Sequence, residues 1–200
     1  MTKPGLIKAL GKVIQLAYLP ADFDAALKYW TQTIGVGPFF LLENVQLGAM
    51  KYRGQPSAAV FSVAIGYWGD IQIELCRAEN AAPSIYAGEY AVTDRLHHVC
   101  IFVESIEEAR RACAEAGAEI IVEGKVGDSG EVIYVDAGGG PGHLIELLQP
   151  MAGSKALFEM MREAAQDWDG SDPLRQLPLA PASNIGATAQ FSRTETSFRG

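Results

Sequence analysis

The sequence predicts an α+β fold in which two tandem βαβββ modules form one curved mixed sheet. The main observation is an internal repeat: a strand followed by an amphipathic helix occurs twice, and each copy ends in a strand that carries a glutamate. Aligned on these features, Gln15 matches His98 and Glu74 matches Glu146. The composition agrees, because 200 residues with 48% hydrophobic and 20% charged side chains can bury one sizeable core. One such module is too small to close its own core, so we expect the two to lie side by side with their helices outside.

The first copy begins with a short strand at residues 13–19. Asp22 follows as an N-cap, because its carboxylate can accept hydrogen bonds from the free N–H groups of a first helical turn. The apolar spacing then predicts a helix over residues 23–33, which ends at Gly35. Further strand-like segments lead to the closing strand at 70–76.

The second copy repeats this order. A strand at residues 96–103 precedes Ser105, which with Glu108 forms a capping box for a helix that runs to Ala116 and stops at the following glycine. The closing strand lies at 142–148. The glycine-rich segment before it lacks the Lys-Ser/Thr of a phosphate-binding loop, so we expect a hairpin turn there.

The repeat and its flanks divide the chain into five parts. We expect an N-terminal lead-in at 1–11, a first βαβββ module at 12–92, a second at 93–150, a C-terminal amphipathic helix at 151–170 and an extended or flexible tail at 171–200. The C-terminal helix is predicted from apolar side chains at helical spacing between Leu157 and Trp168. The tail from Pro178 is rich in polar residues and glycine, so we expect it to be poorly ordered or to depend on a partner.

Charge and cysteine content exclude several classes of function. Sixteen Lys and Arg against 24 Asp and Glu give a net charge of −8, and the scattered basic residues argue against a nucleic-acid partner. We find no apolar run of membrane-spanning length and no signal peptide, and therefore expect a cytoplasmic protein without a membrane partner. The three cysteines are unclustered, which argues against disulfides and zinc fingers. Cys76 and Cys100 are predicted to fill space in the cavity described next.

Four polar side chains are predicted to point into one cavity. Side chains alternate between the faces of a strand, so the face opposite the helices receives the repeat-equivalent residues Gln15, Glu74, His98 and Glu146. Two carboxylates in an apolar cavity repel each other unless a cation lies between them. An oxygen-rich donor set with one imidazole suits a divalent Zn, Ni, Co, Mn or Fe ion. The same alternation predicts that His97 lies under the second helix, away from this cavity.

The motifs resemble those of a known superfamily. They are QLAY at 15–18, GVGPF at 35–39, IQIEL at 71–75, HVCIFV at 98–103 and GHLIEL at 142–147. Over residues 12–150 the chain resembles two-module members of the vicinal oxygen chelate superfamily, which includes glyoxalases, methylmalonyl-CoA epimerases, bleomycin-resistance proteins and extradiol dioxygenases. The resemblance is closest to the glyoxalase and epimerase-like branch. It implies a metal-containing cleft with Gln15, Glu74, His98 and Glu146 as ligands, a set similar to that of zinc-type glyoxalase I.

The resemblance also implies a reaction. It predicts isomerase, epimerase or lyase chemistry through a metal-stabilised enolate of a small or medium-sized apolar carbonyl or acyl substrate, with Glu146 or Glu74 as the base. Aromatic side chains are candidates to contact that substrate, namely Phe39, Tyr67, Trp68, Phe102 and Tyr134. We expect a homodimer that acts on a small molecule. Whether the cleft closes within one chain or across the dimer stays open.

Two alternatives are carried forward. A metal-free binding protein of the bleomycin-resistance type would sequester a ligand between aromatic walls, and its metal content would distinguish it from an enzyme. An extradiol-type dioxygenase needs two histidines and a carboxylate at iron. Strand alternation turns His97 and His143 away from the cavity, which argues against that triad.

Overall fold

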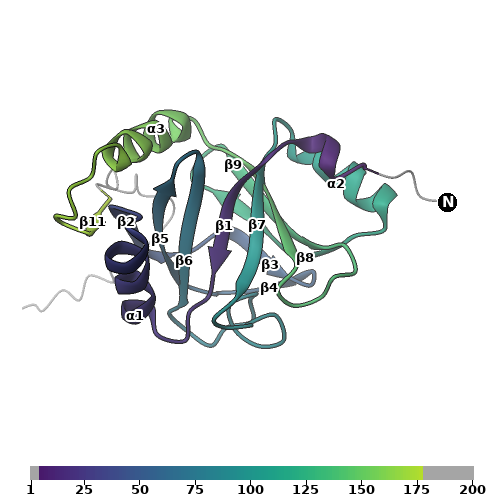
Figure 1. Ribbon diagram of the computed structural model, residues 1–200. Coiled ribbons are helices and arrows are strands. Elements are labelled where there is room, and N and C mark those ends of the chain that lie inside the picture. The colour runs from purple at the N-terminus through teal and green to yellow at the C-terminus, as the bar shows by residue number, and fades with distance from the viewer. Residues whose placement is uncertain (1–4, 178–200) are drawn as a thin grey trace, which may run out of the picture.

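The computed structural model describes residues 5–177, which form one 11-stranded mixed sheet with helices packed on it (Figure 1). The strands are β1 (Val13–Tyr18), β2 (Phe39–Val45), β3 (Gly48–Tyr52), β4 (Gln55–Pro56), β5 (Phe61–Trp68), β6 (Ile71–Ala78), β7 (Leu96–Phe102), β8 (Glu119–Val126), β9 (Gly130–Asp136), β10 (Leu144–Gln149) and β11 (Leu174–Gln176). The helices are α1 (Phe23–Lys28), α2 (Ile106–Ala116) and α3 (Ser154–Ala165), with a 3-10 turn η1 (Lys8–Leu10) and a π-helical turn η2 (Tyr29–Ile34). Of the tail predicted at 171–200, the structure describes residues 171–177, which contain β11, and residues 178–200 lie outside the described residues.

The strand order shows the repeat directly. The sheet runs β11-β2-β5-β6-β1-β7-β10-β9-β8-β3-β4, so the two halves β2-β5-β6-β1 and β8-β9-β10-β7 are equivalent in order. Their first strands, β1 and β7, pair antiparallel at the centre, and each pairs in parallel with the closing strand of its own half. The α+β fold with a curved, open mixed sheet is therefore confirmed.

Local signals set the helix ends as predicted. The side chains of Asp22 and Ser105 accept hydrogen bonds from the backbone N–H three residues ahead, at 2.9 and 3.3 Å. Gly35 and Gly117 end the helical segments in the left-handed conformation that glycine adopts without strain. The first helix differs in one respect, because its second half from Tyr29 is a π-helical turn.

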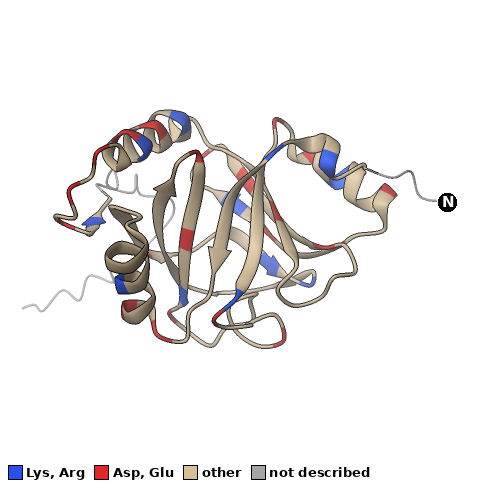
Figure 2. Cartoon of the chain, viewed as in Figure 1, with Lys and Arg blue, Asp and Glu red and all other residues tan. Residues whose placement is uncertain are grey.

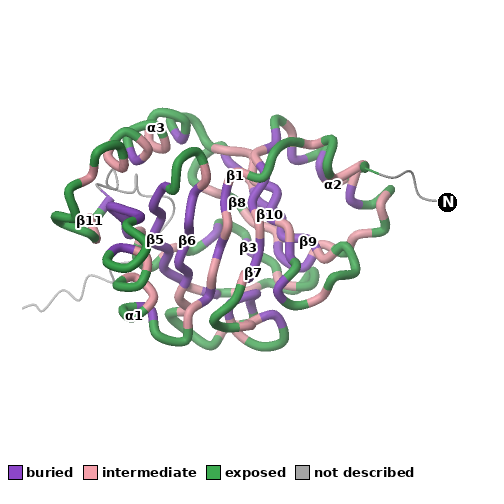
Figure 3. Tube along the Cα trace, in the orientation of Figure 1, coloured by how far each residue is buried: buried purple, intermediate pink, exposed green. Residues whose placement is uncertain are grey.

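The two outer helices cover separate cores on one face of the sheet. The α1 core contains Phe23, Val36, Phe39, Leu41, Ala64, Ile73 and Leu75. The α2 core contains Ile101, Val103, Ile106, Ala109, Cys113, Ile133, Val135 and Leu147. Figure 3 shows the buried residues concentrated along the strands, with the outer surfaces of the helices exposed.

The other, concave face encloses the largest core. The chain leaves β2 at Val45 and starts β3 at Gly48, which pairs with β8 on the opposite half of the sheet. The connecting residue Leu47 packs so closely on β8 that a Cβ at Gly124 would lie 2.7 Å from its Cβ. Leu47 and Met50 thereby join side chains from both halves of the sheet in one buried cluster.

The C-terminal helix α3 lies against the same concave side. Its Met161 is 1% exposed within the large core, and its Phe158 stacks on Phe102 of β7 with ring centroids 5.3 Å apart. Figure 2 shows Lys and Arg scattered over several elements rather than gathered on one face. Among the described helices, none is long and apolar enough to cross a membrane.

Candidate metal centre

Glu74, His98 and Glu146 meet in the buried interior of the concave face. They come from β6, β7 and β10, so both halves of one chain contribute to the cluster. The Nε2 atom of His98 lies 3.4 Å from Oε2 of Glu74 and 3.3 Å from Oε2 of Glu146. His98 is fully buried and the two glutamates are each 7% exposed. These three side chains therefore meet within a single chain.

Strand register explains why the three side chains converge. Ala17 of β1 pairs with Glu74 on one side and with His98 on the other. Paired residues face the same side of a sheet. The side chains of Glu74 and His98 therefore lie on either side of the small methyl group of Ala17 and can contact each other over it. Glu146 pairs with Cys100, two residues along β7 from His98, and reaches the same point.

The donor atoms fit a divalent ion. The Nε2 atom of His98 is buried and has no hydrogen-bond partner, although two carboxylate oxygens are nearby. Two ligand atoms each about 2.1 Å from one ion and separated by a tetrahedral angle lie about 3.4 Å apart. The observed spacings of 3.3 and 3.4 Å match this value. One imidazole and two carboxylates are also a donor set typical of Zn, Mn, Fe, Co or Ni sites.

Gln15 lies beside this cluster and is linked to a second glutamine. It pairs with Gln72 on β6 and with Cys100 on β7, one side-chain layer from Ala17. Its Nε2 donates to Oε1 of Gln72 at 3.0 Å, and Gln72 donates in turn to the Tyr67 hydroxyl at 2.7 Å. This leaves Oε1 of Gln15 as the atom that could serve a cation. Sequence reasoning missed Gln72, although it lies two residues before Glu74 and so shares its face.

The prediction that His97 lies under the second helix is wrong. Tyr18 pairs with Leu96 whereas Ala17 pairs with His98, so His97 is the extra residue of a β-bulge. The bulge breaks the strand alternation and places the fully buried ring of His97 beside that of His98.

The two histidine rings form a hydrogen-bonded chain that sets the tautomer of His98. Nε2 of His97 lies 2.9 Å from the carbonyl oxygen of Ile85, which can only accept, so Nε2 of neutral His97 carries the proton. Its Nδ1 is then an acceptor, and Nδ1 of His98, 2.9 Å away, must donate. Nε2 of neutral His98 therefore presents its lone pair to the two glutamates, as a metal ligand requires. Because both nitrogens of His97 are engaged, it supplies no second histidine ligand for a dioxygenase triad.

Burial and charge move the pKa values of the two histidines in opposite directions. Burial alone would lower the pKa of His98, but the carboxylates of Glu146 and Glu74, which would accept hydrogen bonds from a protonated ring and attract its charge, outweigh burial and raise the pKa to about 9. Burial, together with the neighbouring His98, lowers the pKa of His97 to about 4. In the absence of a cation, a protonated His98 is thus the counterion of the two carboxylates.

Neutral thiols and phenols surround the cluster. Burial raises the pKa of Cys76, Cys100, Tyr86 and Tyr134 well above their ordinary values, so these groups keep their protons. The Cys76 thiol donates to Oε2 of Glu74 at 3.3 Å. The two cysteines are protonated fillers of the cavity wall, in line with their predicted packing role.

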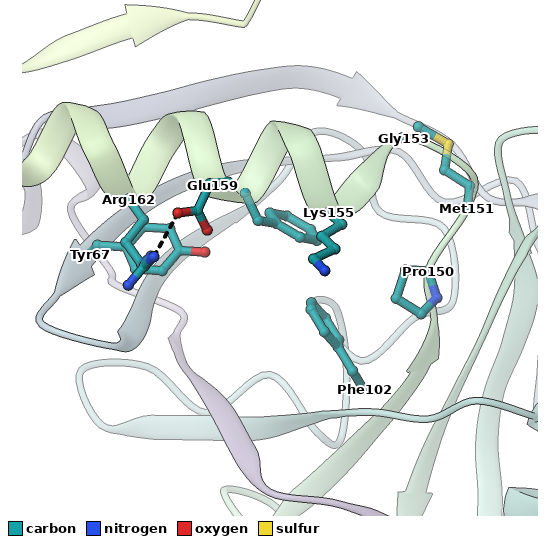
Figure 4. A pocket seen from close by; sticks show the side chains of 9 residues that line it. Tyr67, Phe102, Pro150, Met151, Gly153, Lys155, Glu159 and Arg162 are labelled. Carbon is teal, nitrogen blue, oxygen red and sulfur yellow. Dashed lines mark hydrogen bonds and ion pairs between the residues drawn. The ribbon is translucent and has the colours of Figure 1, made fainter.

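The predicted substrate-contact residues divide into two groups. Tyr67 and Phe102 line a cavity of about 400 Å³ beneath α3 (Figure 4), and Tyr134 lies edge-on to His98 with ring centroids 5.2 Å apart. The other two lie elsewhere. Phe39 is fully buried in the α1 core, and Trp68 is 58% exposed and packs on Trp30 near the same helix. Strand alternation alone did not separate these positions.

Paired βαβββ units that bring a Glu–His–Glu cluster together in one cleft define a class of protein, and comparison with known proteins identifies the family. A model of the glyoxalase/bleomycin resistance protein/dioxygenase superfamily matches residues 14–135. The chain belongs to this superfamily, which confirms the resemblance noted from its motifs. No curated protein matches the sequence.

A comparison with solved structures gave matches of low sequence identity. A hypothetical protein from Bacillus halodurans C-125 is 17% identical, with 70% of this chain and 95% of that chain covered and a TM-score of 0.49. A methylmalonyl-CoA epimerase from Mycobacterium tuberculosis is 15% identical, with 78% and 97% covered and a TM-score of 0.49. A Streptomyces coelicolor methylmalonyl-CoA epimerase in complex with 2-nitronate-propionyl-CoA is 14% identical, with 72% and 96% covered and the same TM-score.

Proposed function

We propose that this protein is a metal-dependent isomerase, epimerase or lyase of the glyoxalase-like type. The observation that carries the proposal is the Nε2 atom of His98, which is buried without a hydrogen-bond partner at ligand spacing from two carboxylates. Glu74, His98 and Glu146 would hold the ion, with Oε1 of Gln15 as the fourth ligand. When bound, a divalent ion would stabilise the negative charge that an enolate places on its oxygen.

The chain's own residues divide the remaining work. Glu74 is restrained by the Cys76 thiol as well as by His98. Glu146 likewise contacts His98 and is hydrogen-bonded by the Cys100 thiol. We assign one of these two glutamates, Glu146 or Glu74, as the base that takes a proton from the carbon next to a carbonyl group. The protonated thiols and phenols around it exclude bulk water without adding charge, which strengthens electrostatic interactions within the cavity.

Metal content and proton exchange test this proposal together. We expect purified protein to contain one divalent ion per chain by elemental analysis, and His98→Gln to contain much less. A screen of carbonyl and acyl thioester compounds in deuterated water should reveal exchange at the carbon next to the carbonyl. Glu146→Gln or Glu74→Gln should abolish that exchange, and Glu131→Gln, which alters a glutamate on neighbouring β9, serves as the matched control. Full activity of metal-free protein, or silence of both Glu146→Gln and Glu74→Gln, would overturn the proposal.

A second candidate function is ligand sequestration without a metal. It is favoured by the charges inside the cluster, because a protonated His98 can form ion pairs with both glutamates without a metal ion and reduces the charge of the cluster from −2 to −1. This protein would contain no stoichiometric metal, would bind an apolar ligand, and would keep that affinity after treatment with a chelator.

A further inference from the structure

A cavity lies beneath α3, on the same face of the sheet as the candidate metal centre. It has a volume of about 400 Å³, within the range of pockets that hold a small organic ligand. Its lining comes from β5, β7, the segment after β10 and α3, and consists of Tyr67, Phe102, Pro150, Met151, Gly153, Lys155, Phe158, Glu159 and Arg162. Most of this surface is apolar, so the cavity favours a ligand with an apolar body.

Hydrogen bonds and strand register link the lining of the cavity to the candidate metal centre. Tyr67 contacts the cavity and accepts the hydrogen bond of Gln72, which in turn holds Gln15. Phe102 follows Cys100 by two residues on the same strand face, a step of about 7 Å along a strand. Cys100 pairs with both Gln15 and Glu146. A ligand that fills the cavity as far as Phe102 therefore ends two residues along β7 from the level of Gln15 and Glu146.

The charged groups of the lining leave a single unpaired cation. Arg162 contacts Glu159 at 2.6 Å and Asp70 at 3.4 Å, so its charge is already balanced. Lys155 forms no ion pair within residues 5–177. Figure 4 shows its ammonium end directed into the cavity toward Phe102, while the Arg162–Glu159 pair lies at the Tyr67 end.

We propose that this cavity is the substrate pocket and that it selects an apolar carbonyl compound bearing one carboxylate, which Lys155 binds. The inference rests on the proposed function, whose substrate class it narrows. In this arrangement the apolar body packs between Phe102 and Phe158, the carboxylate lies at Lys155, and the carbonyl end reaches toward Gln15 and Glu146. The arrangement disfavours a coenzyme A ester, because one free cation and about 400 Å³ do not match its several phosphates and its size.

Two probes of the same shape and different charge test the role of Lys155. The probes are 3-phenylpropanoate and its uncharged amide, 3-phenylpropanamide, titrated into purified full-length protein by calorimetry and by NMR. We expect the carboxylate to bind about two- to fivefold more tightly than the amide, because an ion pair with an exposed lysine adds at most about that much. Lys155→Met should remove this difference while the affinity for the amide stays the same. Lys155→Arg should retain it, and Lys28→Met on α1 is the matched surface control.

The measured outcomes separate this inference from the function on which it rests. Equal affinity for the two probes in the unaltered protein, or an undiminished preference in Lys155→Met, would overturn it. NMR signals of Met151 and Phe158 that do not respond to either probe would overturn the location. Metal content measured on the same samples is independent of Lys155. A metal-loaded protein without carboxylate preference would therefore refute the pocket alone, and a metal-free protein with that preference would refute the enzyme proposal alone.

Discussion

We predict that the stability of metal-free protein depends on pH through the two adjacent histidines, His97 and His98. In metal-free protein the proton on His98 holds Glu74 and Glu146 together, and the pKa of His98 is raised to about 9. The ordinary pKa of about 6.5 applies to the unfolded chain. The folded state therefore binds the proton more tightly, and the resulting stability is complete below pH 6.5 and disappears as the pH rises through 9. A difference of this size corresponds to about 3 kcal/mol of unfolding free energy.

His97 changes the unfolding free energy in the opposite direction at acid pH. Its pKa is lowered to about 4 in the folded protein, so protonation favours the unfolded chain as the pH falls from 6.5 toward 4. The expected loss is again about 3 kcal/mol. Taken together, the two rings place the stability maximum of the metal-free protein near pH 6.5.

Urea unfolding of chelator-treated protein at several pH values measures both slopes. The groups that face His98 are His97, Glu74 and Glu146 and, around them, two thiols and two phenols that keep their protons. Because the raised thiol pKa values add their own loss of stability only above the ordinary thiol pKa of about 8.5, the decisive range is pH 6.5–8.5. His98→Gln should lose the alkaline slope, and added Zn²⁺ should reverse it, since the ion competes with the proton. A flat alkaline slope in metal-free protein would refute the reasoning.

Three further substitutions test other parts of the structure. His97→Leu removes the acceptor that orients His98 and should weaken Zn²⁺ affinity about 10- to 100-fold. His97→Asn keeps an acceptor near the position of Nδ1 and should weaken the affinity less. ¹⁵N NMR of the His98 ring reports its tautomer, and equal affinity in both variants would contradict the role assigned to His97. Met161→Ala should lower the unfolding free energy by about 2–5 kcal/mol, because its side chain fills the large core; Met160→Ala, at an exposed position on the same helix, is the control. Gly124→Ala should cost about 1–3 kcal/mol in urea unfolding, because the added Cβ would lie 2.7 Å from that of Leu47. A stability equal to that of the unaltered protein would contradict either packing argument.

Much of the candidate site could be predicted because it depends on strand alternation, which is local. Glu74, His98 and Glu146 are brought together on the face that their positions in the repeat indicate. The exception is His97, whose bulge arises from the pairing of β7 with β1 and has no signature in the residues of β7 alone. A second exception is Phe39, which was predicted to contact the substrate but packs in the α1 core.

The sequence by itself determined the two βαβββ units, their helix caps and the set of polar side chains that face inward, since each follows from short-range spacing and capping chemistry. Only the tertiary structure decided what closes the cleft. The β3 excursion pairs with the opposite half of the sheet, and α3, which lies outside the repeat, covers the concave face and forms the cavity with Lys155. Such contacts depend on which apolar surfaces remain uncovered after the two units have paired, and no local pattern in the chain specifies that.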